Sequence, residues 1–548
     1  MSVDTNNAAF QDALNLIQYT RQSVFLTGKA GTGKSTFLRY VCEHTKKKHV
    51  VLAPTGIAAI NAGGSTMHSF FKLPFYPLLP DDPNLSLQRG RIHEFFKYTK
   101  PHRKLLEQIE LVIIDEISMV RADLIDAIDR ILRVYSHNLR EPFGGKQLLL
   151  VGDVFQLEPV VKNDEREILN RAYPTPYFFS ARVFSQIDLV SIELQKVYRQ
   201  TDSVFVSVLD HIRTNTAGAA DLQLLNTRYG SHIEESEADM YITLATRRDT
   251  VDSINEKKLA ELAGEPITFE GSIEGDFPES SLPTSQELVL KPGAQIIFIK
   301  NDFDRRWVNG TIGVIAGIDE EEETIYVITD DGKECDVKRE SWRNIRYRYN
   351  EKTKEIEEEV LGSFTQYPIR LAWAITVHKS QGLTFSRVVI DFTGGVFAGG
   401  QAYVALSRCT SLDGIQLKKP INRADIFVRP EIVNFAGRFN DRQAIDKALK
   451  QAQADVQYAA AARAFDKGDM EECLEQFFRA IHSRYDIEKP VPRRLIRLKL
   501  GIINTLQEQN KKLKEQMREQ QERLRQYAHE YLLMGNECIC LLYTSPSP

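Results

Sequence analysis

The segment 28–36, GKAGTGKST, constrains the fold of this chain more than any other. Its spacing of glycine, four residues, glycine, lysine and serine is that of a phosphate-binding loop. The apolar run 23–27 before it predicts a buried strand, and the run 36–41 after it predicts the start of a helix. Such a loop surrounds a phosphate with main-chain N–H groups at a helix N-terminus. We therefore expect an α/β fold that binds a nucleotide.

The side chains of this loop have separate expected tasks. Lys34 would reach the β- and γ-phosphates, and the hydroxyl of Ser35 would hold Mg²⁺. The residues expected to line the nucleotide are Gly28, Ala30, Gly31, Thr32, Gly33, Lys34, Ser35 and Thr36.

Length and composition narrow the class of protein. The chain has 548 residues, a length typical of about three or four domains. Its net charge of −5 gives no overall basic field, so a polyanion would have to bind in a local groove. The six cysteines include no CxxC pair, and the chain shows neither a signal-peptide core nor a membrane-length apolar run. We expect a soluble, reduced, cytoplasmic protein with no membrane partner.

Two apolar strands end in polar side chains suited to hydrolysis. Asp115 and Glu116 follow the run 111–114, and Gln156 follows the run 148–151. Ligands of parallel sheets bind at the carboxyl ends of the strands. One carboxylate there can hold a metal shell, while its neighbour orients and deprotonates the attacking water. We assign Asp115 to Mg²⁺, Glu116 to the general base, and Gln156 to a sensor of the γ-phosphate and the water.

Three further features of the N-terminal part carry weaker predictions. Gln11 could read the adenine edge through its amide, or be an exposed helical residue. Segments 53–59 and 63–71 place small hydroxyl residues at strand ends, where they suit the phosphates of a single strand. Segment 73–80 is rich in proline and aromatic residues and cannot be a regular helix. Its rings could stack on bases or pack onto the core.

After Gln195 the alternation of strands and helices resumes without a second phosphate-binding loop. The strand-like runs are 241–244, 371–376, 388–391 and 414–417. Three clusters rich in arginine or polar residues lie among them, at 194–200, 374–385 and 402–408. An arginine brought to the γ-phosphate from a second domain stabilises the charge of the transition state. Each arginine alone would more simply be a surface residue, so the prediction depends on the whole set.

The motifs, taken in order, resemble those of a known family. They are GKAGTGKST, APTGIAA, DEISM, GDVFQLEPV, VYRQ, AITVHKSQGLTF and AYVALSR. Together they resemble the PIF family of superfamily 1B DNA helicases, relatives of RecD, over residues 5–430. No guanine-reading NKxD sequence follows the loop, unlike in GTPases. The chain departs from the pattern at Glu158, where many relatives have a second proline.

The resemblance implies an ATPase that moves 5′-to-3′ along single-stranded DNA and separates duplex DNA. Members of this family often unwind G-quadruplex DNA as well. Carried over to this chain, it implies an ATP site made of Lys34, Ser35, Asp115, Glu116, Gln156, Arg199 and Arg408, with Gln11 at the adenine. The residues that it implies face DNA are Thr55, Thr66, His68, Thr376, His378, Lys379 and Ser380. The implied location is the cytoplasm, in association with a bacterial nucleoid.

The resemblance also implies the domain organisation: an α/β protein with two RecA-like cores, a small inserted SH3-like β-barrel and a helical C-terminal tail. Short strand-like runs and turns between 290 and 366 independently indicate a small β-barrel. Within it, Lys300, Asn301 and Asn309 could face DNA or be structural. The expected parts are 1–195 for the first core with an insertion at about 71–100, 196–290 and 366–430 for the second core, 291–365 for the barrel, and 431–548 for the tail.

The C-terminal region has its own patterns. Residues 458–469 have the small, aromatic and glycine spacing of one helical hairpin, which must pack on something. A heptad seam follows, made of Ile503, Leu506, Asn510, Leu513, Met517, Gln520, Leu524, Tyr527 and Tyr531. The seam indicates either a parallel dimer or one long solvated helix, and we expect a monomer on DNA. The last residues, 543–548, have no structural logic and could be extraneous to the natural protein.

Two other functions fit the same motifs. In one, the protein is a nucleoprotein adaptor that uses ATP only as a conformational switch. In the other, it is a translocase that strips proteins from DNA without separating strands. The sequence shows no obvious wedge for strand separation, so it leaves these alternatives open.

Overall fold

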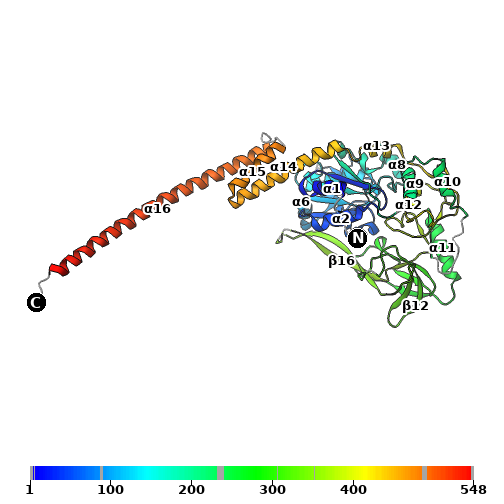
Figure 1. The fold of residues 1–548 in the computed structure, drawn as a ribbon. Helices are drawn as coiled ribbons and strands as arrows, with labels where there is room; N and C mark the ends of the chain where they lie inside the picture. Colours follow the sequence, from blue (N-terminus) through cyan, green and yellow to red (C-terminus); the bar gives the residue numbers. More distant parts are fainter. Residues whose placement is uncertain are drawn as a thin grey trace. The chain divides into compact units, whose positions relative to one another are not determined.

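The computed structural model describes residues 4, 7–86, 91–200, 202–230, 240–304, 306–350, 352–353, 355–483 and 490–544 (Figure 1). The chain divides into two compact units, residues 1–452 and 453–548, each considered by itself. Residues 545–548, part of the segment expected to be extraneous, lie outside the described residues. In the part of the chain that the structure describes, no helix combines the length and the apolar character needed to cross a bilayer.

The first core is a six-stranded parallel sheet with the strand order β3-β2-β4-β5-β1-β6. Because helices cover both faces, nearly every strand residue is buried and apolar. Helices α1 and α2 cover one face, and α6 and α7 pack on the other. The strands are β1 (Val24–Gly28), β2 (His49–Ala53), β3 (Ser65–Thr66), β4 (Leu111–Ile114), β5 (Gln147–Val151) and β6 (Val190–Leu194); the helices are α1 (Ala8–Tyr19), α2 (Lys34–His44), α3 (Gly56–Ala62), α4 (Met67–Phe71), α5 (Arg91–Phe96), α6 (Lys100–Gln108), α7 (Ala122–Tyr135) and α8 (Asn163–Asn170).

The proline-rich segment after α4 realises both of its expected alternatives. It contains no regular helix between residues 73 and 80, as its prolines require. Leu73 and Leu78 are buried in the first core. Phe75 is 82% exposed and Tyr76 50% exposed, so these two rings remain available for stacking. The segment is therefore anchored by its leucines and presents its aromatic rings to solvent.

The second core is a four-stranded parallel sheet with the order β18-β7-β19-β20. Its strands are β7 (Ile242–Ala245), β18 (Ala374–Thr376), β19 (Val388–Asp391) and β20 (Ile415–Leu417), and its helices include α9 (Ser203–Arg213), α10 (Ala219–Asn226), α11 (Arg248–Glu261) and α12 (Gln401–Leu406). The expected run 371–376 is broken at Ala372 and Trp373. Its first part belongs to β17 (Ile369–Leu371), which pairs in a different sheet.

The inserted β region differs from the expected barrel. It contains a five-stranded antiparallel sheet, β14-β13-β12-β11-β17, a three-stranded sheet, β15-β16-β9, and the pair β10-β8. Among the described residues these sheets stay open, and no closed barrel is found. The strands are β8 (Ile267–Glu270), β9 (Ser272–Gly275), β10 (Glu287–Leu290), β11 (Gln295–Phe298), β12 (Ile312–Asp319), β13 (Thr324–Thr329), β14 (Glu334–Val337), β15 (Glu340–Tyr349) and β16 (Ile356–Gln366).

The length of the β15–β16 ribbon gives one physical reason for the open sheets. Its distal end does not return to the insertion but packs against the first core (Figure 1). Tyr347 and Tyr349 are buried in the first core's apolar cluster, and the Tyr347 hydroxyl accepts a hydrogen bond from the main-chain N–H of Val51 at 3.3 Å. The ribbon therefore joins the insertion to the first core.

After β20 the chain returns to the first core. Helix α13 (Pro430–Ala436) is followed by Phe435 and its neighbours packing among the first core's aromatic rings. Asn440 then pairs with the free edge of β6, because its amide accepts from the N–H of Glu193 at 2.8 Å and donates to the carbonyl of Glu193 at 3.3 Å. The first turns of α14 (Arg442–Lys467) bury apolar side chains on the same core. The compact unit thus extends past residue 430, where the second core was expected to end.

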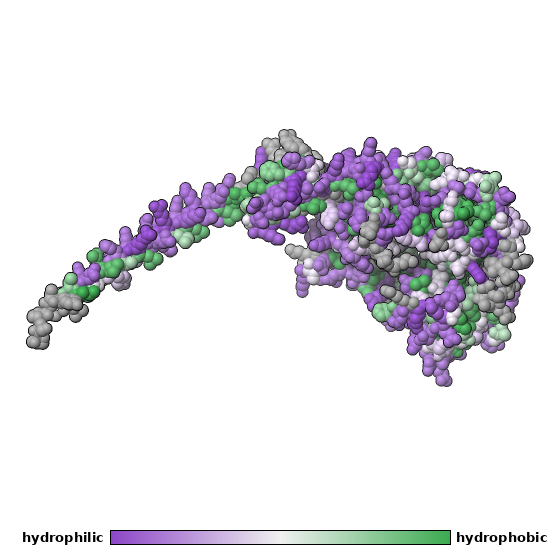
Figure 2. All heavy atoms as spheres, in the orientation of Figure 1, coloured by the Kyte–Doolittle hydropathy of each residue, from purple (hydrophilic) through white to green (hydrophobic). Residues whose placement is uncertain are grey.

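The second unit confirms the expected helical hairpin. The end of α14 and helix α15 (Met470–Ser483) meet at Gly468, whose φ of 82° is a left-handed conformation that favours glycine. The rings of Tyr458 and Phe477 lie 5.9 Å apart between the two helices. Helix α16 (Pro490–Thr544) follows. Its heptad seam is uncovered in this single chain, with Leu513 58% exposed, and apolar residues alternate with polar ones along the helix in Figure 2.

Candidate functional site

The phosphate-binding loop has the expected strand, loop and helix around it. Strand β1 ends at Gly28, and α2 begins at Lys34 with Gly33 as its N-cap. Gly31 and Gly33 have φ angles of 80° and 88°, which only glycine adopts at little cost. A side chain at Gly31 would also place its Cβ 2.4 Å from the Cβ of Arg199. Close approach by the arginine therefore requires glycine at this position.

Lys34 occupies the inside of its own loop. Its ammonium group donates hydrogen bonds to the main-chain carbonyls of Gly28 at 2.6 Å and Lys29 at 3.0 Å. Burial lowers the pKa of Lys34. A buried ammonium group held only by neutral oxygens is poorly compensated, so an anion in the loop would stabilise it.

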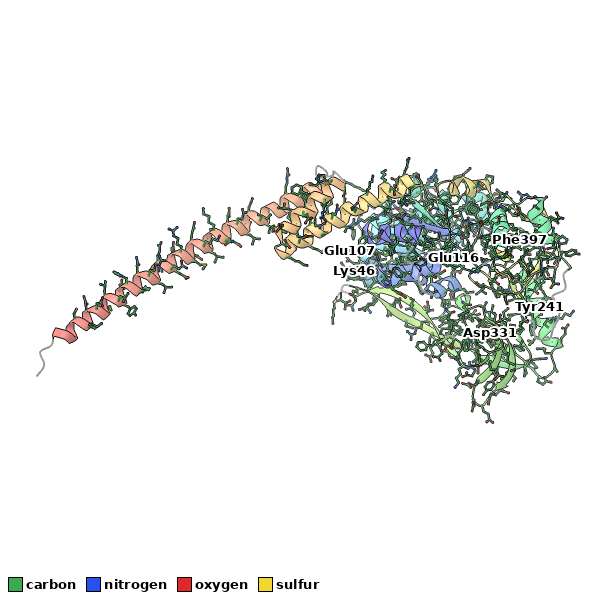
Figure 3. The ribbon with its side chains drawn as sticks, viewed as in Figure 1. Lys46, Glu107, Glu116, Tyr241, Asp331 and Phe397 are labelled. Atoms are coloured by element: carbon green, nitrogen blue, oxygen red, sulfur yellow. The ribbon has the colours of Figure 1, made fainter. Side chains whose placement is uncertain are left out.

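The acidic pair follows β4 as expected, and its backbone is strained. Glu116 has a φ of 50°, a left-handed conformation that non-glycine residues seldom adopt. The carboxylate of Asp115 accepts a hydrogen bond from the N–H of Glu116 at 2.9 Å. Burial, followed by the charge of Asp115, raises the pKa of Glu116 to about 7 (Figure 3). A carboxylate with a pKa near neutrality is well matched to general-base work.

Gln156 lies beyond the end of β5 and is only 7% exposed. Its amide donates to the carboxylate of Asp153 at 3.4 Å. Its carbonyl oxygen accepts from the amide of Gln381 at 3.4 Å, and the same amide of Gln381 donates to the carboxylate of Glu116 at 2.7 Å. A residue of the second core therefore touches both the expected base and the expected sensor.

Both expected arginines lie at the boundary between the two cores. Arg199 packs beside Gly31, and its guanidinium donates to the carbonyl of Ser407 at 3.3 Å. Arg408 is only 1% exposed. Burial, and then the positive charge of Arg199, lowers the pKa of Arg408 to about 9. The negative charges of Glu116 and Asp153 act on it in the opposite direction, which places Arg408 within their reach.

The bonds of Arg408 leave its charge uncompensated. Its guanidinium donates to neutral oxygens only in the bonds described: the carbonyls of Val404 at 2.9 Å, Ser380 at 3.4 Å and Leu383 at 3.3 Å, and the hydroxyl of Ser407 at 3.0 Å. A buried cation of this kind is costly unless an anion approaches it. The arrangement suits a guanidinium that meets phosphate during the reaction.

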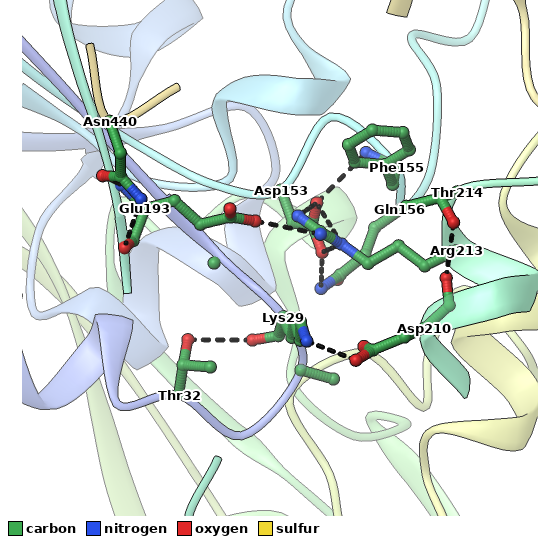
Figure 4. Close-up of polar contacts among 12 residues, drawn as sticks. Lys29, Thr32, Asp153, Phe155, Gln156, Glu193, Asp210, Arg213, Thr214 and Asn440 are labelled. Carbon is green, nitrogen blue, oxygen red and sulfur yellow. Dashed lines mark hydrogen bonds and ion pairs between the residues drawn. The ribbon is translucent and has the colours of Figure 1, made fainter. Parts of the chain in front are cut away.

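An ionic network that sequence reasoning missed joins the first core to α9 (Figure 4). Arg213, at the end of α9, forms ion pairs with Asp153 at 3.0 Å and Glu193 at 2.9 Å, and it lies 4.5 Å from the centre of the Phe155 ring. The loop residue Lys29 pairs with Asp210 of the same helix (Figure 4). The sequence gives no sign of this network, because the partners are far apart along the chain.

Tyr403 is a second missed contact. Its hydroxyl accepts a hydrogen bond from the main-chain N–H of Ala30 at 2.9 Å, across the boundary between the cores. The tyrosine is 3% exposed, and burial raises its pKa well above the usual range of a phenol. Tyr403 and Gln381 both lie inside motifs that the sequence identifies, so the motifs were the available signal.

The residues of the first core expected to face DNA lie at neighbouring strand ends. Thr55 caps α3 by accepting from the N–H of Ala58 at 3.2 Å, and Thr66 caps α4 by accepting from the N–H of Ser69 at 3.2 Å. Each hydroxyl keeps its hydrogen for a phosphate oxygen. The ring of His68 stacks on that of Phe75, with centroids 4.9 Å apart and planes at 13°.

The second group expected to face DNA forms a tight turn after β18. The hydroxyl of Thr376 accepts from the N–H of Lys379 at 3.2 Å, and the Lys379 side chain is exposed. Burial lowers the pKa of His378, which favours its neutral form. Ser380 differs from the others, because it is 0% exposed and its hydroxyl donates to the carbonyl of Val377 at 2.8 Å. In this arrangement the Ser380 hydroxyl is a packing group and is not presented to DNA.

The donor set fits a nucleotide with its metal ion. Ser35 is exposed in the first turn of α2, and Asp115 stands at the end of β4, two strands away from β1 in the sheet. Mg²⁺ typically takes one or two protein oxygens and completes its shell with water and phosphate. In keeping with so sparse a protein shell, the described residues contain no cluster of three or more histidine, cysteine or acidic ligands. Gln11 is half-buried in α1, where its adenine contact stays a prediction.

Comparisons with known proteins agree with this geometry. Residues 4–217 match the family described as PIF1-like helicase. The ATP-dependent DNA helicase Pif1 of Campylobacter jejuni is 33% identical over 412 residues, which cover 72% of this chain and 88% of that protein. A crystal structure of Bacteroides sp Pif1 in complex with ADP-AlF4 is 40% identical, with a TM-score of 0.73 over 80% of this chain and 97% of that one. A structure of Bacteroides Pif1 bound to ssDNA is also 40% identical, with a TM-score of 0.58 over 81% and 99%.

Proposed function

This chain belongs to the PIF1-like helicase family and is an ATP-dependent DNA helicase, and from that premise we propose that it moves 5′-to-3′ along single-stranded DNA with Mg²⁺ as cofactor. The observation that carries the proposal is the meeting of four elements in one place. The phosphate-binding loop and the acidic pair come from the first core, and Gln381 and Arg408 come from the second. Neither core alone contains all the groups that hydrolysis needs.

We assign the roles as follows. Lys34 holds the β- and γ-phosphates, and the loop residues from Gly28 to Thr36 surround them with N–H groups. Ser35 and Asp115 would hold Mg²⁺, which supplies charge neutralisation at the phosphates when bound. Glu116 takes the proton of the attacking water. Arg199 and Arg408 meet the charge that develops on the transferred phosphoryl group.

DNA would cross the carboxyl ends of both parallel sheets. Thr55, Thr66 and His68 would contact it from the first core, and Thr376, His378 and Lys379 from the second. Contacts to phosphate oxygens fix position but carry no base sequence, so binding would be insensitive to sequence and weakened by salt. When ATP closes the cleft, the two groups approach each other along the strand. Unequal grip by the two cores then turns each cycle into a step.

The direction of movement is the part of this proposal most open to a direct test. A duplex with a 5′ single-stranded overhang should be separated in the presence of ATP and Mg²⁺, because loading on that overhang points the motor at the duplex. The same duplex with a 3′ overhang, or with blunt ends, should remain paired. Separation is followed by release of a fluorescently labelled strand. Preference for the 3′ overhang would reverse the proposed polarity, and ATP turnover without any strand release would favour a protein-stripping translocase.

Several finer assignments are proposals of the same kind. G-quadruplex DNA would be a substrate because a strand pulled past the cleft loses its folded partner contacts regardless of their type. The inserted sheets would be an SH3-like module that is open on one side, and the parts 1–195, 196–290 with 366–430, 291–365 and 431–548 would be the working domains. The protein would act in the cytoplasm at the bacterial nucleoid.

The heptad seam of α16 supports a proposal about assembly. A single copy would unwind DNA, and the seam would pair two copies in parallel, with Asn510 at a central position setting the register. The average molar mass, measured by light scattering, should rise with concentration towards that of a dimer. Leu513→Lys together with Leu524→Lys should hold the mass at one copy, while the outward-facing control Lys511→Gln should not. A constant single-copy mass in the unaltered protein would rule out the dimer.

A further inference from the structure

The turn after β18 is a rigid connection between two surfaces of the second core. Its main chain is fixed by successive hydrogen bonds, from the N–H of Ser380 to the carbonyl of Thr376 at 3.0 Å and from the N–H of Gln381 to the carbonyl of His378 at 3.3 Å. Lys379 is exposed on one side, whereas Ser380 is fully buried. Because the turn is short and internally bonded, a displacement of Lys379 must also move Gln381.

The other side of this turn touches the ATP cleft at several atoms. The amide of Gln381 donates to the Glu116 carboxylate at 2.7 Å and to the Gln156 carbonyl at 3.4 Å. The guanidinium of Arg408 donates to the main-chain carbonyls of Ser380 and Leu383, which flank Gln381. The expected base, the expected sensor and the expected arginine therefore all contact six consecutive residues of one turn.

We propose that Gln381 is a positioning residue that restrains Glu116 until DNA moves the turn. The proposal rests on the proposed function, since it needs Glu116 as base and Lys379 at the DNA. A carboxylate oxygen that accepts a hydrogen bond is held in one orientation, and the lone pair engaged by the amide is not available to the attacking water. DNA that engages Lys379 and Thr376 shifts the turn, breaks this bond and frees Glu116. ATP hydrolysis then becomes dependent on DNA through one side chain.

The arrangement explains why the restraint comes from the second core. If a first-core residue held Glu116, its bond would be indifferent to the position of the second core. A bond across the cleft is broken by the relative movement that DNA and ATP together impose. Gln156 takes part in the same contact, so the water-orienting group would be released in the same event.

The test uses the full chain with Gln381→Leu, which removes the amide and keeps the side chain's bulk. Turnover without DNA should rise about tenfold, the effect expected from losing one hydrogen bond to a charged group. The KM for ATP should stay unchanged, because no phosphate contact is altered. The ratio of turnover with DNA to turnover without it should fall accordingly. Affinity for a labelled single-stranded oligonucleotide, measured by fluorescence anisotropy, should not change.

Two further variants make the result decisive. Gln381→Glu replaces the donor by a carboxylate that repels Glu116 and should raise DNA-independent turnover as well, so a folding defect in one variant cannot hide the effect. Ser386→Ala, an exposed neighbour on the same segment, is the matched control and should behave like the unaltered protein. If both folded Gln381 variants keep the original turnover without DNA, the restraint does not exist. If their DNA affinity falls instead, Gln381 is a DNA contact and the inference is wrong.

Glu116→Gln separates failure of this inference from failure of the proposed function. It should bind ATP, because it keeps the loop intact, and it should lose turnover both with and without DNA. Normal hydrolysis by Glu116→Gln would mean that the base lies elsewhere, and the proposed site would fail with the inference. Loss of turnover in Glu116→Gln alongside unaltered behaviour of both Gln381 variants would overturn only the restraint.

Discussion

Arg408→Ala should reduce ATP turnover by about 10³ to 10⁵-fold, the range found when a transition-state arginine is removed from a phosphoryl-transfer site. The guanidinium is buried, its described bonds go to neutral oxygens, and the charge of Arg199 disfavours it further. Such a charge is poorly compensated before phosphate arrives and well compensated when negative charge develops there. ATP binding should therefore fall far less than turnover. Steady-state phosphate release and binding of a fluorescent ATP analogue measure the two quantities.

Burial of Arg408 demands a control for folding. The side chain holds the turn after β18 through Ser380 and Leu383, so its removal could loosen the second core. Arg408→Lys keeps a positive charge but loses the planar fork, and it should restore stability better than activity. Thermal unfolding of each variant separates the two effects. If Arg408→Ala stays folded and hydrolyses ATP at more than a tenth of the original rate, Arg408 does not act on the transition state.

Lys34→Ala should lower turnover by about 10² to 10³-fold, as expected when a preorganised donor to the developing charge is lost. The ammonium group now bonded to the carbonyls of Gly28 and Lys29 would move to the phosphates when ATP enters. ATP affinity should fall as well, because the same contact forms in the ground state. Single-stranded DNA binding without nucleotide should remain, since the expected DNA contacts lie at other strand ends.

Lys29→Ala is the matched control for this prediction. Both lysines belong to one loop, but Lys29 points to Asp210 on α9 and Lys34 points into the loop. Removing Lys29 takes away the same charge without taking away the phosphate donor, so turnover should fall much less. Equal losses in the two variants would show that the loop responds to net charge and that the assigned contact of Lys34 is wrong.

Local sequence predicts the groups that follow single strands. The loop, the acidic pair and Gln156 each come directly after an apolar run, so strand and side chain are read together. The same logic predicted the parallel strands of both cores. It missed the break at Ala372 and Trp373, where one apolar run divides between two sheets. Hydrophobicity alone does not record which sheet a strand joins.

Contacts between the cores could not be predicted in this way. Gln381 and Glu116 are separated by 265 positions, and Arg213 and Asp153 by 60. Such pairs are fixed by the packing of whole domains, which no local periodicity reports. The expected closed barrel failed for a related reason: alternation predicts strands, whereas closure depends on which edges meet, and the β15–β16 ribbon ends on the first core instead.

The second core is joined to the first along two separate stretches of chain. It leaves β6 towards α9, where Arg213 is fixed to Asp153 and Glu193, and it returns through α13 to Asn440 on the edge of β6. A rigid body held at two points can turn only about the line that connects them. The swing of the second core would then have one degree of freedom, and every turnover would displace the DNA-facing turn along the same arc. A motor built in this way needs no separate device to keep its stride constant.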